Sequence, residues 1–451
     1  MRPPERNEEL ALAIDNLGSE GQGIGRHEGF AVFVPFALPG ERVRARVIKP
    51  GKSFAVAKLT EILEKSPERA EPPCPAFGRC GGCTLMHLSY AAQLEYKRHE
   101  VENALRRIGG FADVPVKPAI GMDEPLRYRN KASFPFGTED GTARFGFFAP
   151  RSHRLVALDS CPIQQGALVD CAKAVRKWAN ACEIPVYDET TGKGALRHIV
   201  ARSDKAGEVM AVVVTNGPLP HKGELIAALR EGVPGIASIL HNRNDKNTNA
   251  IFGGRFETLW GKDQLEETIC GLRFDVSAAS FLQINPEQTE KLYREVEALL
   301  PEGLGNVADV FCGAGTITLL AAKKAKRAVG IECVPEAVAD AARNAEKNGV
   351  ANARFICGDA AAELPRLVSS GFSPDAVILD PPRKGCDPAV LDAVVASGAP
   401  RVVYVSCDPA TLARDCKRLR EGGYELRSVQ PVDMFPQTAH VETVVLMSHN
   451  M

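Results

Sequence analysis

The sequence lacks an excess of charge of either sign. Its 451 residues include 55 Lys and Arg against 56 Asp and Glu, which leaves a net charge of −1 at pH 7. A protein that coats nucleic acid over its whole surface is strongly basic, so this class is excluded. Any site for a polyanion must instead be a local patch of basic side chains.

Long apolar runs are also missing. The most apolar stretch, residues 307–322, is interrupted by Asp309 and two glycines, and a span of the bilayer takes about 20 residues. The first nine residues, MRPPERNEE, contain no apolar core of the kind found in a secretory signal. We therefore expect a cytoplasmic protein without membrane contact, and nothing in the sequence indicates an obligate protein partner.

Cysteine, by contrast, is plentiful, with 13 residues. In a reducing compartment such thiols stay free, bind metals or act in catalysis rather than form disulfides. With 45% hydrophobic and 25% charged residues, the composition is that of a globular protein. The length is sufficient for two or three domains.

Residues 1–66 have the pattern of a small β-barrel, because short strands alternate with Gly-rich or Pro-Gly turns. The expected strands are 10–17, 30–35, 41–48 and 55–63. Arg42, Arg44 and Arg46 alternate with apolar residues, so their guanidinium groups leave the same face of a strand. No acid occurs between Arg42 and Thr60. This row is typical either of a nucleic-acid-binding face or of an ordinary solvated face, and the pattern leaves both open.

Residues 67–268 have a mixed α+β pattern. A proline-containing linker at 66–73 precedes a helix expected at 89–108, with Ser89 as its N-cap, and we expect this helix to pack on the C-terminal part of the chain. Paired strands are expected within 131–148 and 195–214. The stripe expected to be buried on the helix comprises Tyr90, Leu94, Val101, Leu105 and Ile108.

Residues 269–451 alternate between short apolar strands and helical patterns such as 334–348. The expected strands are 306–311, 328–332, 353–357, 376–380 and 401–406. This alternation predicts a doubly wound, Rossmann-like α/β domain with a parallel sheet that is covered on both faces. The fold expected for the whole chain is therefore a β-barrel, a mixed α+β domain and an α/β domain.

Glycines or acidic residues follow the first four of these strands, at the end of the sheet where a doubly wound fold binds its ligands. They are Gly313 and Gly315 after the first strand, Glu332 after the second, Asp359 after the third and Asp380 after the fourth. A carboxylate at Glu332 suits a ribose diol, and Asp359 suits an amino group. Thr318 stands where a dinucleotide fingerprint has its third glycine, which favours S-adenosylmethionine over a nicotinamide cofactor. Helix capping explains one or two of these acids, but not the series.

Cys407 follows the fifth strand, in the turn SCDP. Most cysteines at the end of an apolar strand are small buried hydrophobes. Here the polar turn favours a nucleophile, and we expect Arg383 and Lys384 of the DPPRKG motif to lower the pKa of its thiol.

Four other cysteines form a candidate metal site. Cys74, Cys80 and Cys83 lie close together in the sequence, and Cys161 is isolated in the segment DSCP. Four thiolates can bind either zinc or an iron–sulfur cluster. The spacing alone favours zinc, which is the commoner structural metal.

Five motifs occur in a specific order along the chain. They are FLQINP from Phe281, FCGAG from Phe311, DPPRKG from Asp380, SCDP from Ser406 and HVET from His440. Together they resemble the S-adenosylmethionine-dependent RNA uracil-5-methyltransferase family over nearly the whole chain. The barrel resembles the OB-like TRAM domain of that family. The four cysteines resemble its iron–sulfur site, which changes the interpretation from zinc to a structural 4Fe–4S cluster.

The resemblance implies a mechanism and a set of site residues. Cys407 would bond to carbon 6 of uracil, and Glu442 would remove the proton from carbon 5, although outside the motif Glu442 would be interpreted as a surface strand residue. Thr316 stands where many members of the family have Asn. Asp380 and Gln283 are also expected at the uracil edge. The residues expected at S-adenosylmethionine are Gln283, Phe311, Gly313, Gly315, Thr316, Glu332, Asp359 and Asp380.

The RNA substrate is expected to be 23S rRNA, because the four-cysteine site is typical of that branch of the family, with tRNA as the alternative. The target nucleotide must be looped out or extruded, since carbon 5 is inaccessible in a stacked helix. Two other functions fit parts of the pattern: an amino-methyltransferase that holds a base with Asp380, and a non-catalytic RNA-binding protein. A requirement for Cys407 distinguishes a uracil-5-methyltransferase from the first alternative. Binding of S-adenosylmethionine distinguishes it from the second.

Overall fold

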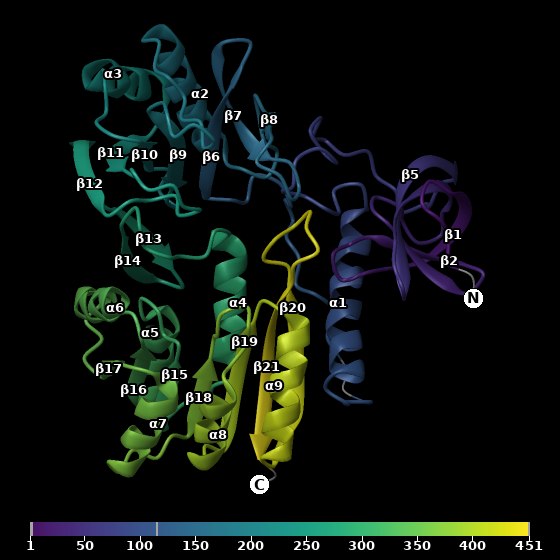
Figure 1. The fold of residues 1–451 in the computed structure, drawn as a ribbon. Coiled ribbons are helices and arrows are strands. Elements are labelled where there is room, and N and C mark those ends of the chain that lie inside the picture. The colour runs from purple at the N-terminus through teal and green to yellow at the C-terminus, as the bar shows by residue number, and fades with distance from the viewer. Residues whose placement is uncertain (1–2, 114–115, 450–451) are drawn as a thin grey trace.

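The computed structural model describes residues 3–113 and 116–449 and is shown in Figure 1. A barrel at the N-terminus, a central mixed sheet and a C-terminal α/β sheet follow one another along the chain, as the sequence predicts. Among the described residues, none of the helices combines the length and apolar character that crossing a bilayer requires.

The N-terminal unit is a closed five-stranded barrel with the strand order β1-β2-β3-β5-β4. Its strands are β1 (Glu9–Leu17), β2 (Gly23–His27), β3 (Phe30–Val34), β4 (Arg42–Pro50) and β5 (Phe54–Glu64). Alternation along β4 places Val43, Ala45 and Val47 in the interior, where they are fully buried. The small barrel expected from the turn pattern is therefore confirmed.

The arginine row on β4 does not form a face of one charge. Arg42 pairs with Glu64 at 2.8 Å, Arg44 pairs with Glu61 at 2.5 Å, and Arg46 pairs with Glu9 at 2.8 Å. These acids come from the neighbouring strands β5 and β1, and strand-by-strand inspection of the sequence cannot show such partners. The stretch 66–73 is likewise more than a linker, because Arg69 pairs with the buried carboxylate of Glu41 at 2.6 Å.

Helix α1 (Tyr90–Arg107) begins at the expected N-cap, since the backbone N–H of Ala92 donates to the Ser89 hydroxyl at 3.3 Å. It packs along α9 (Pro409–Glu421) and β20 (Tyr424–Val432) of the C-terminal unit. The prediction that Ile108 is buried is wrong: the side chain lies beyond the last helical residue and is 44% exposed. The buried face instead includes two polar side chains, Gln93 and Lys97, which hydrogen-bond to the segment before Glu442.

The central unit is a seven-stranded sheet in the order β12-β11-β10-β9-β6-β7-β8. The expected strand pairs are present as the antiparallel pairs β6–β7 and β9–β10. Its elements are β6 (Lys131–Glu139), β7 (Thr142–Phe148), β8 (Leu155–Ala157), α2 (Gly166–Ala181), β9 (Leu196–Ser203), β10 (Val209–Thr215), α3 (Lys222–Gly232), β11 (Ile236–Arg243) and β12 (Arg255–Gly261). A hairpin of β13 (Leu265–Ile269) and β14 (Leu272–Val276) leads to the C-terminal unit.

The C-terminal unit is a seven-stranded sheet in the order β17-β16-β15-β18-β19-β21-β20. The first five of these strands are parallel, and β21 runs antiparallel between β19 and β20. The strands are β15 (Leu304–Val310), β16 (Ala325–Glu332), β17 (Ala353–Cys357), β18 (Ala376–Leu379), β19 (Arg401–Ser406), β20 (Tyr424–Val432) and β21 (Glu442–His449). The doubly wound fold is confirmed.

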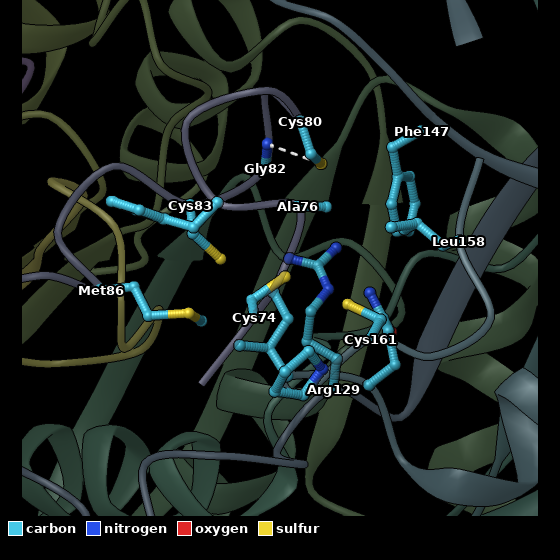
Figure 2. A pocket seen from close by; sticks show the side chains of 14 residues that line it. Cys74, Ala76, Cys80, Gly82, Cys83, Met86, Arg129, Phe147, Leu158 and Cys161 are labelled. Carbon is cyan, nitrogen blue, oxygen red and sulfur yellow. Dashed lines mark hydrogen bonds between the residues drawn. The ribbon is translucent and has the colours of Figure 1, made fainter. Parts of the chain in front are cut away.

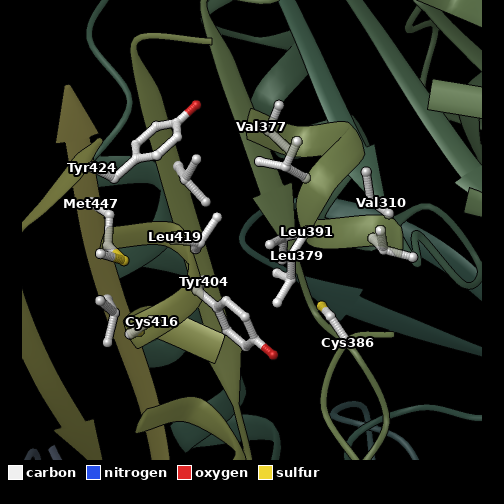
Figure 3. Packing of buried hydrophobic residues seen from close by; sticks show 14 of the residues in the cluster. Val310, Val377, Leu379, Cys386, Leu391, Tyr404, Cys416, Leu419, Tyr424 and Met447 are labelled. Atoms are coloured by element: carbon white, nitrogen blue, oxygen red, sulfur yellow. The ribbon is translucent and has the colours of Figure 1, made fainter. Parts of the chain in front are cut away.

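Helices cover both faces of this sheet. The helices are α4 (Pro286–Ala298), α5 (Thr316–Ala322), α6 (Pro335–Lys347), α7 (Ala360–Ser369), α8 (Pro388–Ala396) and α9 (Pro409–Glu421). The first three share one apolar cluster with the sheet, and the last three share another with α1. Figure 3 shows the second cluster, in which Leu391 of α8 and Leu419 of α9 lie near Tyr404 of β19. This packing fixes the strand ends that carry the site.

Candidate active site

The strand order reverses between β15 and β18, which are neighbours in the sheet although two strands separate them in sequence. Loops that leave adjacent strands in opposite directions open a crevice at the carboxyl ends, where ligands of doubly wound sheets bind. Except for Gln283, which precedes α4, the residues expected at a cofactor lie at the carboxyl ends of β15, β16, β17 and β18 or directly after them. The topology therefore brings them to one edge of the sheet.

The loop after β15 has a backbone suited to a close ligand. Phe311, Gly313 and Gly315 all have positive φ angles, of 72°, 53° and 83°. A Cβ atom on Gly315 would lie 2.9 Å from Phe355, so only glycine fits there without a shift. A Cβ atom on Gly313 would meet nothing within 4 Å, so this part of the loop borders open space. A non-glycine residue such as Phe311 in this conformation is typical of functional sites.

Glu332 lies at the end of β16 and joins two loops. One carboxylate oxygen accepts the backbone N–H of Gly313 at 3.2 Å, and the other accepts that of Val334 at 2.9 Å. The carboxylate is therefore held beside the glycine loop, where a ribose diol of a bound cofactor could use its remaining acceptor capacity.

Two of the other expected cofactor residues, Asp359 and Thr316, have structural partners. Asp359 is the N-cap of α7 and accepts the backbone N–H of Ala361 at 2.8 Å, so capping accounts for one of its oxygens. The buried hydroxyl of Thr316 hydrogen-bonds with that of Tyr293 from α4 at 3.2 Å. Gln283 is partly buried in the segment between β14 and α4, two residues before the α4 N-cap Asn285.

Cys407 and Glu442 come together through strand pairing. Ser406, the last residue of β19, pairs with Thr443 of the antiparallel strand β21. One further step of this register places Cys407 opposite Glu442, with both side chains on the same face of the ladder. Asp380 follows β18, the other neighbour of β19. The expected nucleophile, the expected base and a second acid therefore lie at the same edge of the sheet.

Burial and like charges control the pKa values of this group. Burial, followed by the charge of Asp380, raises the pKa of Glu442 to about 8, and the guanidinium of Arg383 partly opposes this shift. Burial also raises the pKa of Asp380 to about 7. The site therefore favours uncharged carboxyl groups near neutral pH in the protein alone.

The prediction that a basic side chain of the DPPRKG motif lowers the pKa of Cys407 is confirmed for Arg383, but other effects outweigh it. Burial, followed by the charge of Glu442, raises the pKa of the thiol to about 11, and the opposing effect of Arg383 is smaller. Motif order indicates a basic side chain near the thiol, but it shows neither the burial of the thiol nor the opposing charges of Glu442 and Asp380. A bound cation or substrate must shift this balance before the thiolate can form in quantity.

Two residues near the site were not singled out from the sequence. Asp309 of β15 is 1% exposed, burial raises its pKa to about 7, and the Thr318 hydroxyl donates to it at 2.5 Å. In the sequence, Asp309 is an acid inside an apolar strand, and such an acid can also be a simple interruption of the strand. Phe281 is 80% exposed, and its loop is held from the central unit by Arg202, which donates to the Ser280 carbonyl at 3.1 Å. An aromatic side chain exposed to this degree is typical of sites that stack on bases.

The four candidate metal ligands, Cys74, Cys80, Cys83 and Cys161, line one cavity of about 200 Å³ together with Arg129, as Figure 2 shows. Burial, followed by the charges of the other three cysteines, strongly raises the pKa of Cys83. Within residues 3–113 and 116–449, no three His, Cys, Asp or Glu side chains are grouped closely enough to hold one metal ion. The four sulfur atoms therefore border a cavity and do not converge on the position of a single metal ion.

Comparison with protein families gives two matches. The family described as tRNA (Uracil-5-)-methyltransferase matches residues 261–450, and the TRAM domain matches residues 3–60. These matches fall on the C-terminal α/β unit and on the N-terminal barrel.

Comparison with individual proteins covers nearly the whole chain. It is 46% identical over 448 residues to an uncharacterized RNA methyltransferase from Halalkalibacterium halodurans, which covers 99% of this chain and 98% of that protein. A second one, from Caldanaerobacter subterraneus subsp. tengcongensis, is 47% identical over 450 residues and covers 99% of both chains. Among solved structures, the tRNA (uracil-54, C5)-methyltransferase of Pyrococcus abyssi in complex with S-adenosyl-L-homocysteine is similar, with a TM-score of 0.79 and 29% identity. That match covers 97% of this chain and 99% of the other.

Proposed function

The chain belongs to the S-adenosylmethionine-dependent RNA uracil-5-methyltransferase family, and from this premise we propose that it methylates carbon 5 of a uridine through a covalent bond to Cys407. The observation that carries this proposal is the pairing of Ser406 with Thr443, the residues next to Cys407 and Glu442, together with the effect of the Glu442 charge on the Cys407 thiol. Nucleophilic catalysis needs a thiolate and a base on the same substrate ring, and this arrangement presents both from adjacent strands.

The chemistry divides between these two residues. The Cys407 thiolate adds to carbon 6 of uracil, so that carbon 5 gains carbanion character. Bound S-adenosylmethionine supplies the electrophilic methyl group. Glu442 then takes the proton from carbon 5, the carbon 5–carbon 6 double bond re-forms, and the bond between carbon 6 and sulfur breaks to release the thiolate. Carbon 5 of free uracil is too weak a nucleophile to react without this activation.

Neighbouring side chains hold the two reactants. In this proposal Gln283 and Asp380 hydrogen-bond the uracil edge, and an Asp380 that keeps its proton can donate to a carbonyl oxygen of the ring. The Glu332 carboxylate, the glycine loop with Gly313 and Gly315, Phe311 and Thr316 provide the cofactor side. Phe281 offers a flat apolar surface on which an unstacked base can lie.

Replacement of Cys407 by Ser tests the proposal. We expect no methylation of RNA and no covalent adduct, whereas Cys386→Ser, which alters a buried cysteine, should retain both. Cys407→Ser that still methylates RNA would favour an amino-methyltransferase instead. Failure of the wild-type protein to bind S-adenosylmethionine in calorimetry would indicate an RNA-binding protein without catalysis.

The RNA substrate is proposed to be 23S rRNA, with tRNA as a second candidate. The four-cysteine site favours rRNA, whereas the solved structure that is similar over 97% of the chain is named as a tRNA methyltransferase. Mapping 5-methyluridine in both RNA classes from a deletion strain separates the two. Loss of the modified base from tRNA alone would overturn the rRNA assignment.

A structural 4Fe–4S cluster is proposed for the four-cysteine site, and the shape of the site supports it. Four thiolates around one zinc ion would lie only about 3.8 Å apart, because each Zn–S bond is about 2.3 Å. The sulfurs instead border a cavity of about 200 Å³. In addition, the backbone N–H of Gly82 donates to the Cys80 sulfur at 3.4 Å, and hydrogen bonds to sulfur are typical of cluster ligands. Iron and sulfide in anaerobically purified protein would support the cluster, and one zinc without iron would refute it.

A further inference from the structure

The segment 433–441 joins β20 to β21 and leads directly into Glu442. The last residue of β20, Val432, pairs with Glu442 in the antiparallel register. Asp433 is therefore adjacent to the cross-strand partner of the proposed base. Any shift of the segment changes where the carboxylate of Glu442 lies relative to Cys407.

One end of the segment is held by helix α1. Lys97 and Asp433 form an ion pair in which both side chains are fully buried. The same ammonium group donates to the carbonyl of Phe435 at 3.0 Å, and the hydroxyl of Tyr90 donates to Asp433 at 2.9 Å. Removing one partner of such a buried pair is strongly destabilising, because the other charge is left without compensation.

The middle of the segment rests on the chain that follows the cysteine site. The backbone N–H groups of Thr84 and Leu85, which come directly after Cys83, both donate to the carbonyl of Gln437 at 3.0 Å. The Thr84 hydroxyl accepts the backbone N–H of Ala439 at 3.1 Å. Gln437 has a φ angle of 71°, a conformation that persists only where its surroundings enforce it.

A second connection runs from the cysteine cavity through Tyr128. Its ring packs in the apolar cluster that includes Cys74, Cys83 and Cys161, and its hydroxyl donates to the carbonyl of Pro436 at 3.0 Å. Two independent contacts thus join the four-cysteine site to consecutive residues of the same segment.

We infer that the four-cysteine site acts in the reaction by holding segment 433–441, and with it Glu442, in place, and that Gln437 is a positioning residue. This inference rests on the proposed function. It locates the effect in the second half of the reaction, where Glu442 takes the carbon-5 proton and the Cys407 thiolate leaves. Loosening the support slows that step more than it slows addition of the thiol, so the covalent protein–RNA adduct accumulates.

Two matched pairs of variants test the inference. Cys83→Ser removes a ligand of the cysteine site, and Cys182→Ser removes a partly buried cysteine outside it. Gln437→Val places a β-branched residue at the positive φ angle, whereas Gln437→Asn keeps an amide that tolerates this conformation. Gln437→Val leaves all four cysteines intact and therefore reports on the inference even if Cys83→Ser fails to fold.

The readout is the fraction of protein that migrates covalently bound to RNA on a denaturing gel, with S-adenosylmethionine affinity from calorimetry as a check of folding. We expect Cys83→Ser and Gln437→Val to raise the adduct fraction and to lower kcat about tenfold, a part of the roughly 10²–10⁴-fold that a positioned base contributes. Gln437→Asn should lie nearer the wild type, and Cys182→Ser should match it.

Glu442→Gln is the reference that separates this inference from the proposed function. If Glu442→Gln traps the adduct but Cys83→Ser and Gln437→Val only weaken RNA binding, the inference fails and the proposed function stands. If Glu442→Gln traps no adduct, the proposed function fails as well.

Discussion

Cys407 and Glu442 each lie one residue beyond the Ser406–Thr443 pair, where β19 meets β21. The reversal of β21 within an otherwise parallel sheet makes this possible, because it brings the start of one strand against the end of another. The ladder below them is buried, so the register of the two strands is fixed. The fold therefore brings the two residues together, whereas the exact position of Glu442, the first residue of β21, also depends on the segment 433–441 that leads into it.

The pH dependence of methylation should report this pair. Both pKa values are raised, to about 8 for Glu442 and about 11 for Cys407, and both groups act after losing a proton. We expect kcat to rise with pH through the range of about 6 to 9. Arg383 lowers both pKa values, so Arg383→Met should displace the profile to higher pH.

Lys384→Met is the matched control for that experiment, since Arg383, and not Lys384, is among the main causes of the pKa shifts of Cys407 and Glu442. Initial rates at saturating RNA measure the profile for each variant. A rate that falls as pH rises through 8, or equal displacement by both variants, would contradict this electrostatic description.

Replacement of Glu332 by Gln should weaken the binding of S-adenosylmethionine. The substitution removes the charge and replaces one of the two oxygens that accept N–H groups from Gly313 and Val334. Hydrogen bonds to charged groups contribute about 1.5–3 kcal/mol, so we expect about a 10- to 100-fold larger Kd by calorimetry. Glu336→Gln, in the exposed first turn of α6, is the control and should leave the Kd unchanged.

Asp309 should make the folded protein less stable as pH rises. Burial raises its pKa to about 7, above the value of about 3.9 for an unfolded chain, so folding favours the protonated form. The penalty is absent below about pH 4 and grows until the pH passes about 7. Asp309→Asn removes this penalty. We therefore expect the substitution to stabilise the fold at pH 8 by about 2–4 kcal/mol more than it does at pH 4.

Denaturant unfolding at both pH values measures this difference, with the exposed Asp387→Asn as control. An Asp309→Asn variant with the same pH dependence as the wild type would show that the carboxyl is ionised in the fold.

The salt dependence of RNA binding should show which basic side chains of the barrel contact RNA. Lys49, Lys52 and Lys58 are exposed, and among the described residues no ion pair is found for them. If they contact single-stranded RNA, replacing all three by Ala should reduce the slope of log K against log salt by about 2. Replacing both Arg44 and Glu61 by Ala should leave the slope unchanged, because Glu61 already neutralises the charge of Arg44. Equal slopes for wild type and the lysine variant would exclude this face from RNA binding.

Much of the fold could be predicted from periodicity. The barrel strands, the Ser89 N-cap and the alternating strands of the C-terminal unit all leave local patterns in the sequence. The pairing partners do not: Glu64, Glu61 and Glu9 neutralise the arginine row from other strands. The prediction that Ile108 is buried fails for a related reason. The buried face of α1 is selected by polar contacts with distant residues, such as the contact between Lys97 and Asp433, which are 336 positions apart in the sequence.

The site was predicted in its residues but not in its electrostatics. Motif order indicated Cys407 and Glu442, and strand ends indicated the acids. The raised pKa of Cys407 depends on the burial and charges that three neighbouring strands create together, and no linear spacing encodes these. The same holds for the support of segment 433–441 by residues near Cys83.

The central claim is a transient bond between the Cys407 sulfur and carbon 6 of a uridine, and RNA that contains 5-fluorouridine tests it most directly. Fluorine leaves no carbon-5 proton for Glu442 to remove, so the methylated adduct cannot resolve. With S-adenosylmethionine present, we expect a protein–RNA complex stable to denaturation whose peptide mass places the nucleotide on Cys407. Methylated RNA without any adduct, or an adduct on another residue, would contradict the account.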